Sequence, residues 1–162
     1  MEPEQTNLKD VTLRFLSETT NITASLGTVS SEGAPHSAIV YFSIDENLHF
    51  YFLTAVDTQK YKNLLANPKA SLALGSGPEY VTVQAQGQTA LLEKGSEEEK
   101  IAIATIKKRL VENQQTWPIF QLSDYESEAV AVFKFTPSVL YFLNLDKNNG
   151  LPVTTEGLQQ VI

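Results

Sequence analysis

The residues with the clearest chemical potential stand at the start of a short predicted helix, in the run Asp57-Thr58-Gln59-Lys60. Asp57 or Thr58 suits the N-cap position, because a short polar side chain accepts a hydrogen bond from a free backbone N–H group there. Lys60 falls in the first helical turn, where a cation opposes the helix dipole. The conflict disappears if an anion such as phosphate binds there, with Thr54 of the preceding strand adding a hydroxyl. A lysine that points into water fits the same pattern.

The sequence carries no recognisable catalytic set. There is no cysteine, which excludes a thiolate nucleophile, a disulfide framework and a cysteine-ligated metal. His36 and His49 are the only histidines, both fall in predicted strands, and neither has an acid that we identify as a local partner. We therefore expect structural roles for both and no metal site. Glycine-rich nucleotide loops and a nucleophile elbow are also missing, so no catalytic residue is assigned.

The elements that position Lys60 follow from the hydrophobic spacing, which is helical at first and alternates with period two further along. Helices are predicted around residues 8–15, over 57–66, and from the capping box at 96–99 through residue 110. Strands are predicted over residues 24–30, 36–44, 48–54, 70–74, 80–92, 128–135 and 139–145. Gly87 inside a strand indicates a bulge, and the acids at 97–99 are expected to face solvent. The fold class is α+β with six or seven mostly antiparallel strands.

The second predicted strand is apolar on both of its faces. It carries Ala38, Val40, Phe42 and Ile44 on one face and Ile39 and Tyr41 on the other. An antiparallel strand in a simple two-layer protein usually leaves one face in water. This strand therefore indicates a barrel wall that is covered outside by a helix, a ligand or a partner subunit.

Length and composition fit one domain over residues 1–162, with a polar tail at about 146–162. We expect a cytoplasmic protein, because the N-terminal run has neither a basic start nor an apolar core and no apolar run is long enough for a membrane span. The formal net charge is −7, so nucleic acid is not an expected partner. The only tryptophan, Trp117, lies in a segment without regular pattern and is expected to plug the barrel mouth or to stack on a ligand.

A series of short motifs runs through the chain in a definite order. The series comprises Leu26-Gly27-Thr28-Val29, Gly33-Ala34-Pro35-His36, Leu48-His49-Phe50-Tyr51-Phe52-Leu53-Thr54, Lys60, Asn63-Leu64, Asn67-Pro68-Lys69-Ala70-Ser71-Leu72, Gln86-Gly87-Gln88-Thr89-Ala90 and Phe135-Thr136-Pro137-Ser138-Val139-Leu140-Tyr141. In order and spacing, over roughly residues 8 to 145, it resembles the pyridoxamine 5′-phosphate oxidase-like, FMN-binding split-barrel superfamily, in its uncharacterised, general-stress-protein-like branch.

The resemblance implies a six-stranded antiparallel split β-barrel with flanking helices, which forms a homodimer with two flavin sites between the subunits. It places the phosphate at the start of the helix after the third strand and the flavin ring along the second strand. The cofactor-binding residues that it implies are Ala38, Ile39, Val40, Leu53, Thr54, Gln59, Lys60 and Thr82.

The chain also departs from the family pattern. Thr58-Gln59-Lys60 stands where strong FMN binders often have Ser-Arg-Lys, and Ala38 and Ser43 stand where vitamin B6 oxidases place an arginine and a lysine. The C-terminal Arg-x-His motif of those oxidases is missing, so this activity is not expected. Three interpretations remain: an FMN-dependent oxidoreductase of unknown substrate, a non-catalytic binder of flavin, deazaflavin or haem, and a dimeric scaffold without a cofactor.

Overall fold

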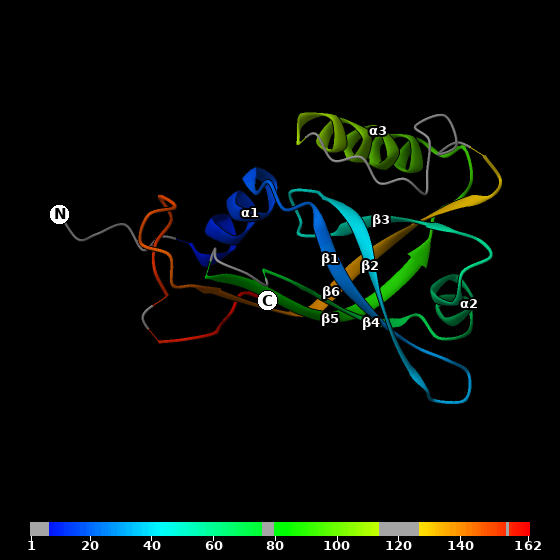
Figure 1. Cartoon of the computed structure of the whole chain (residues 1–162), viewed down its shortest axis with the longest axis horizontal. Coiled ribbons are helices and arrows are strands. Elements are labelled where there is room, and N and C mark those ends of the chain that lie inside the picture. The colour runs from blue at the N-terminus through cyan, green and yellow to red at the C-terminus, as the bar shows by residue number, and fades with distance from the viewer. Residues whose placement is uncertain (1–6, 76–79, 114–126, 155) are drawn as a thin grey trace.

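The computed structural model describes residues 7–75, 80–113, 127–154 and 156–162 (Figure 1). The helices of this part are α1 (Leu8–Glu18), α2 (Gln59–Ala66) and α3 (Glu97–Glu112). The strands are β1 (Thr23–Val29), β2 (Pro35–Ile44), β3 (Phe50–Ala55), β4 (Lys69–Leu74), β5 (Val81–Leu91), β6 (Val130–Asn144) and β7 (Gln159–Gln160). Trp117 lies outside the described residues.

Within these residues the strands form one antiparallel sheet in the order β3-β2-β1-β4-β5-β6-β7. An additional ladder joins β3 to β6, from Phe50↔Phe135 to Ala55↔Val130, and closes the first six strands into a barrel. The expected α+β fold with a six-stranded antiparallel barrel is therefore confirmed, and the short β7 extends the sheet beside β6.

The last two predicted strands are one continuous strand, β6, so the break expected at residues 136–138 is wrong. Proline is tolerated in a strand at a bulge, where a ladder hydrogen bond is already lost. Pro137 pairs with Gly87, at the point where the register between β5 and β6 shifts after Gln86. A Cβ atom on Gly87 would lie 2.1 Å from the carbonyl oxygen of Thr136. The bulge expected at Gly87 is thus present, and it allows β6 to continue without a break at Pro137.

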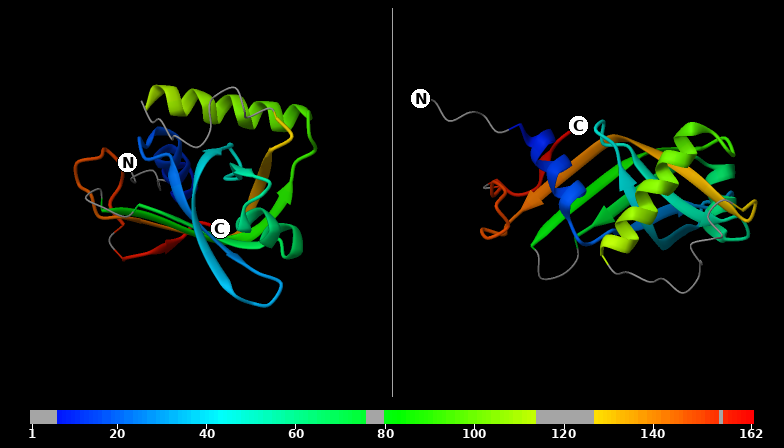
Figure 2. Two further views of the ribbon diagram at one scale, coloured as in Figure 1. Left: turned by 45° about the vertical axis from the view of Figure 1, so that its right-hand side comes forward. Right: turned by 90° about the horizontal axis from the view of Figure 1, so that it is seen from above.

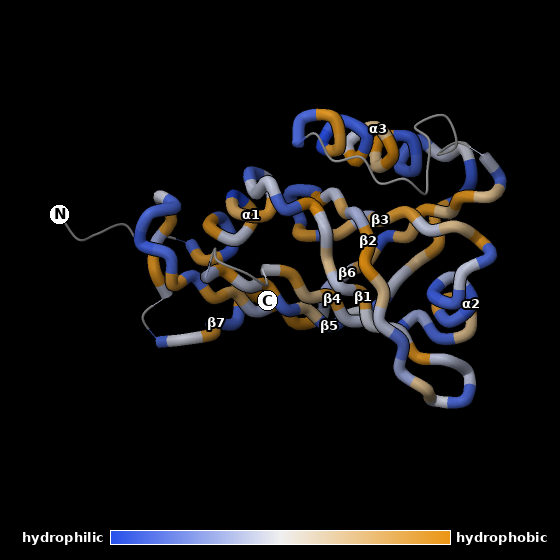
Figure 3. The backbone as a smooth tube through the Cα atoms, in the orientation of Figure 1, coloured by the Kyte–Doolittle hydropathy of each residue, from blue (hydrophilic) through white to orange (hydrophobic). Residues whose placement is uncertain are grey.

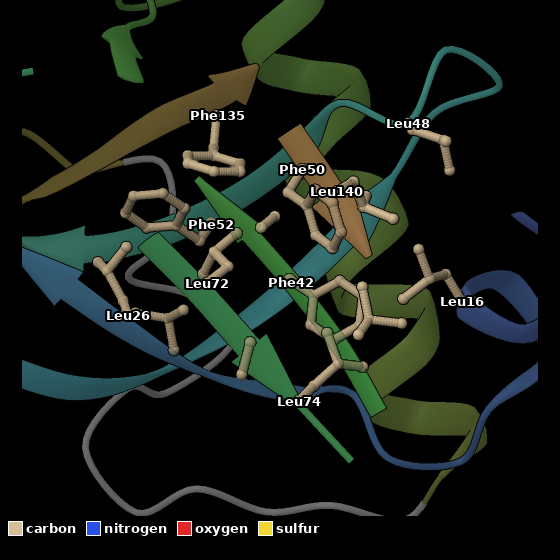
Figure 4. Packing of buried hydrophobic residues seen from close by; sticks show 14 of the residues in the cluster. Leu16, Leu26, Phe42, Leu48, Phe50, Phe52, Leu72, Leu74, Phe135 and Leu140 are labelled. Atoms are coloured by element: carbon tan, nitrogen blue, oxygen red, sulfur yellow. The ribbon is translucent and has the colours of Figure 1, made fainter. Parts of the chain in front are cut away.

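The barrel interior is a single apolar core. Alternate residues of the strands point inward, including the fully buried Phe42, Phe50, Phe52 and Phe135, which Figure 4 shows gathered with leucines of neighbouring strands. Several rings pack against each other, with Phe52 and Phe133 stacked at 5.7 Å between centroids. Period-two alternation is thus the property of the sequence that builds the barrel.

The helices cover different parts of the barrel (Figures 1 and 2). α1 and α2 lie toward opposite ends, and both insert apolar side chains into the core, Phe15 and Leu16 from α1 and Leu64 from α2. α3 instead crosses the outside of the wall, where its apolar residues pack on β3 and β6 in a second buried cluster. Hydrophilic and hydrophobic residues alternate along α3 in Figure 3, as expected for a helix with one buried face.

The C-terminal segment is more firmly held than its polar composition suggests. Asn144, which is fully buried, donates through its side chain to the carbonyl of Pro152 and accepts from the backbone N–H of Asp146. The backbone N–H of Asn144 also donates to the Thr154 hydroxyl at 2.9 Å. The described part of the tail is therefore folded back on the barrel rather than loosely attached.

Candidate functional site

The barrel wall opens where β2 and β3 part. These strands pair only from Phe42↔Phe52 to Ile44↔Phe50. Beyond that point β2 follows β1 as far as Pro35, whereas β3 follows β6 as far as Ala55. This divergence is flanked by the predicted cofactor residues Ala38, Ile39 and Val40 on β2, Leu53 and Thr54 on β3, and Gln59 and Lys60 at the start of α2.

The side chains of this group differ in what a ligand can reach. Ile39 faces outward with 56% of its surface exposed. Val40 belongs to the barrel core, and Leu53 is buried in the cluster beneath α3. Thr54 is 1% exposed. For Val40, Leu53 and Thr54, only a role through the backbone or through packing is compatible with this placement.

Hydroxyl groups at the start of α2 bond to one another. Thr58 is the N-cap, and its hydroxyl accepts from the backbone N–H of Tyr61. The same hydroxyl donates to the carbonyl of Ala55 at 2.8 Å and lies 2.9 Å from the Thr54 hydroxyl. Thr54 therefore supports the N-cap instead of presenting its hydroxyl to an anion.

Lys60 and Gln59 occupy different environments in the first turn of α2. Burial lowers the pKa of the Lys60 amine, and the carboxylate of Asp57 acts in the opposite direction. The Gln59 side-chain amide donates to Asn63 at 2.8 Å, and Asn63 donates to the hydroxyl of Thr28 at 2.9 Å. This chain of hydrogen bonds, buried between Asn63 and Thr28, fastens α2 to β1 and turns the exposed Gln59 side chain along the helix.

Thr82 does not join the other predicted residues within one chain. It pairs with Leu143, whereas Thr54 pairs with Ala131 near the other end of the same strand. Figure 1 shows α2 and the start of β5 at opposite sides of the barrel. The Thr82 hydroxyl donates to the carbonyl of Leu74 at 3.0 Å.

The outer face of the sheet from β2 to β6 is free of charged side chains over two adjacent rows of cross-strand neighbours. One row is Ile39, Ser25, Ala73, Gln84 and Tyr141, and the next is Ser37, Gly27, Ser71, Gln86 and Val139. We call these ten residues the uncharged face. Charged residues make up 19% of the whole chain, so the uncharged face is poorer in charge than the chain as a whole.

Two grooves hollow the uncharged face and its edge. The larger groove has a volume of about 530 Å³, runs beside the β1–β2 hairpin and is lined in part by His36, Lys69 and Gln88. The smaller groove has a volume of about 290 Å³ and lies over Ser25 and Gln84. The Nδ1 atom of His36 is buried without a hydrogen-bond partner in the described residues. Sequence reasoning missed this surface, although the lack of charge at alternate positions of five strands was a visible signal.

A polar cluster outside the barrel corrects the expectation that His49 has no local acid partner. His49 does have an acid partner, because its Nδ1 lies 2.8 Å from the carboxylate of Asp45 across the turn between β2 and β3. The Tyr51 hydroxyl lies 3.1 Å from Asp45 and 2.9 Å from Glu98 of α3, which also accepts from Lys134. Desolvation, together with hydrogen bonds to these acids, raises the pKa of Tyr51. Glu98 therefore joins α3 to β3 and β6.

Glu99 also differs from the solvated residue that we expected. It is 3% exposed and accepts from the backbone N–H of Gly95 at 2.7 Å. Its own backbone N–H donates to the N-cap hydroxyl of Ser96. The Ser96 half of the expected capping box is thus present, whereas the Glu99 carboxylate bonds to the residue before the N-cap and the backbone N–H of Ser96 donates to the carbonyl of Glu93.

Neither arginine of the chain faces the start of α2. Arg14 pairs with Glu18 on the exposed side of α1. Arg109 is 8% exposed and donates to the carbonyls of Leu16 and Phe42, at 3.1 and 3.3 Å. Arg109 therefore fastens α3 to α1 and β2, and burial lowers its pKa, with Glu112 acting in the opposite direction.

The first six strands pair in a closed ring, and β2 and β3 diverge beyond Phe42↔Phe52. These two features define a split β-barrel protein, and we call the divergence of β2 and β3, beside α2, the split. Residues 10–144 match the protein family described as pyridoxamine 5′-phosphate oxidase. The chain belongs to this family, as the motif series predicted.

Solved structures with the same fold carry different names. The chain is 19% identical to general stress protein 26 of Bacillus anthracis (TM-score 0.60, covering 86% of this chain and 99% of that one). It is 17% identical to the haem storage protein HutZ of Vibrio cholerae (TM-score 0.63, covering 81% and 89%). It is 13% identical to a haem-binding protein of Mycobacterium smegmatis (TM-score 0.66, covering 93% of this chain but only 56% of that one). A search of curated proteins gives no match.

The residues at the split fit the two parts of FMN unequally. The exposed Ile39 and the uncharged face suit a planar, weakly polar ring. At the start of α2, the donors available to a phosphate are Lys60 and the first N–H groups of the helix.

None of the described helices has the length and apolar character needed to span a membrane.

Proposed function

We propose that this chain binds a flavin, with FMN as the first candidate, and works as a homodimer. The observation that carries the proposal is the parting of β2 and β3 in a chain of this family, because seven of the eight predicted cofactor residues belong to β2, β3 and the start of α2. Ile39 and the backbone of Ala38 and Val40 would contact the ring, and Lys60 would face the phosphate.

The uncharged face supports the homodimer. Protein interfaces are depleted of charged residues at their centre, and this face lacks them across five strands. A second copy covering the face would shield Ile39 and would bring the partner's copy of this face beside the split. In that arrangement a residue distant from Lys60 within one chain, such as Thr82, can reach the site of the partner.

We further propose that the protein is an oxidoreductase whose electron transfer is supplied by the bound flavin. In that case the protein binds and orients the ring and excludes water from it, and no side chain has to act as acid or base. This agrees with a split that places apolar and amide side chains beside the ring and a single lysine at the helix. A cytoplasmic location remains part of the same proposal.

Haem is the second candidate, and it is favoured by two of the similar structures, the haem storage protein and the haem-binding protein. The side chains that could ligate iron are His36, beside the larger groove, and His49, beside Asp45. Deazaflavin stays a third possibility with the same demand for a planar site.

The test is the visible absorption spectrum of the purified protein, with mass spectrometry of whatever is released on denaturation. Bands of oxidised flavin with the mass of FMN support the proposal, and a Soret band with the mass of haem replaces it by the second candidate. A colourless protein that retains neither compound after addition and removal of the excess refutes both and leaves a scaffold.

A charge reversal tests the assigned site directly. Lys60→Glu places two carboxylates, Glu at 60 and Asp57, where the phosphate would lie, so we expect FMN affinity to fall at least tenfold with riboflavin affinity unchanged. Fluorescence titration measures both constants, and circular dichroism checks that the barrel stays folded. Equal FMN affinity in the variant removes Lys60 from the site.

A further inference from the structure

We infer that the start of α2 in this chain gives a phosphate only a weak contact, through Lys60, so a flavin is held chiefly by its ring and the chain distinguishes little between FMN and riboflavin. The inference rests on the proposed flavin site and determines which part of the ligand supplies the affinity. It differs from the expectation drawn from the family resemblance, which is that residues at the start of this helix bind the phosphate tightly.

The start of α2 carries one lysine, Lys60, and one acid, Asp57. Lys60 is the cation of the first turn on this side of α2, and the carboxylate of Asp57 acts on it through space. Lys62 stands two residues further on, about 200° around the helix from Lys60. A phosphate monoester carries roughly −1.5 to −2 charges at neutral pH, so it would meet a lysine and a carboxylate with little net positive charge.

The other cations of the neighbourhood are committed elsewhere. Lys134 donates to Glu98 at 2.9 Å, and Arg109 faces backbone carbonyls of α1 and β2. Lys69 follows α2 at its C-terminal end, about 12 Å along the helix axis from its start, and borders the larger groove. Within the described residues of one chain, no arginine or second lysine is therefore placed to share a phosphate with Lys60.

The hydroxyl and amide groups at the helix start are already paired. Thr54 and Thr58 bond to each other and to the carbonyl of Ala55, and Thr54 is 1% exposed. Gln59 donates to Asn63 at 2.8 Å. An arriving phosphate would gain the hydroxyl donors only by breaking these bonds, and the second N–H of the Gln59 amide offers it one neutral donor.

The first experiment compares FMN with riboflavin, which differs only in lacking the phosphate, by fluorescence titration in the same buffer. We expect FMN to bind less than tenfold more tightly, which corresponds to less than about 1.4 kcal/mol. A larger ratio overturns the inference while supporting the proposed function. If neither flavin binds, the proposed function fails, and the inference is then decided by the phosphate titration described below.

A gain-of-function variant makes the comparison sharper. Gln59→Arg adds a guanidinium, which binds phosphate through two parallel hydrogen bonds. We expect it to raise the ratio of FMN to riboflavin affinity at least tenfold over that of the unmodified chain. Leu65→Arg is the matched control, because it adds the same charge at a 55% exposed position near the far end of α2 and should change the ratio less than threefold. An unchanged ratio in Gln59→Arg overturns the inference, since the missing cation would not be the cause.

A readout without any flavin uses inorganic phosphate. Nuclear magnetic resonance follows the backbone amide signals of Gln59 and Lys60 as phosphate is added at constant ionic strength. The inference predicts no saturable shift in the millimolar range. A saturable shift with a dissociation constant below about 1 mM, lost in Lys60→Met, demonstrates a phosphate site and overturns the inference.

Discussion

Replacing Tyr51 by phenylalanine removes one hydroxyl and leaves the packing of the ring in place. That hydroxyl has a single proton for two carboxylates, Asp45 at 3.1 Å and Glu98 at 2.9 Å. A hydrogen bond to a charged group contributes about 1.5–3 kcal/mol to stability. Each carboxylate keeps another donor, His49 or Lys134, and the acid side chains are 31% and 45% exposed, so water can replace the lost bond. We therefore expect the low end of that range, about 1.5 kcal/mol.

Urea unfolding at pH 7, followed by far-ultraviolet circular dichroism, measures this loss as a shift of the midpoint at constant slope. Tyr61→Phe is the matched control, because the Tyr61 hydroxyl has no hydrogen-bond partner among the described residues, and it should cost less than about 0.5 kcal/mol. A loss below that value for Tyr51→Phe would refute the view that this hydroxyl joins α3 to the barrel. A changed slope would mean that α3 detaches before the barrel unfolds.

Further predictions concern pH, packing and assembly. Hydrogen bonds from Lys134 and, to a smaller extent, from Tyr51 lower the pKa of Glu98. The contribution of Glu98 to folding stability is therefore present above the ordinary carboxyl pKa and is lost as the pH falls through the lowered value. The stability difference between the unmodified chain and Glu98→Gln should shrink below about pH 4, and a constant difference in urea titrations from pH 3 to 7 would contradict this. Gly87→Ala should lower the free energy of unfolding by about 1–3 kcal/mol, because the new methyl group meets the backbone of Thr136 and Pro137. In Gly27→Ala the methyl group meets only the end of the Ser71 side chain, so this variant should cost less. Thermal unfolding compares the two variants, and the reverse order of stability would refute the argument. Ile39→Glu should convert a dimer to a folded monomer in sedimentation velocity, and an unchanged dimer would place the interface elsewhere.

Local chemistry in the sequence predicted much of the barrel. Alternation identified the strands, Thr58 suited the N-cap of α2, and Gly87 indicated the bulge. The apolar spacing of the helix at 57–66 groups Leu65 with Tyr61 and Leu64, but the structure packs Tyr61 and Leu64 on the core and leaves Leu65 55% exposed. Errors of this kind arise because a helical stripe of apolar residues does not say how many of them the neighbouring surface can receive.

Interactions across the chain were harder to predict. Nothing near Glu98 in the sequence points to Tyr51, and the partner of Arg109 is a set of backbone carbonyls that only the packing of α1 against α3 brings together. The pair of His49 with Asp45 is different, because the two are four residues apart on either side of a turn and could have been recognised. For the cofactor site, the sequence located the split, but the pairing of its hydroxyl and amide groups became visible only in three dimensions.

The ladder between β3 and β6 bears on how the chain folds as it is synthesised. β3 is complete at Ala55, but the strand that pairs with its free edge begins at Val130, so the barrel stays open until most of the chain has been made. During that interval the unpaired edge of β3, with its buried-type residues Phe50 and Phe52, offers a template for pairing with other chains. We expect closure by β6 to be the slow step of refolding, since contacts between residues so distant in sequence form late.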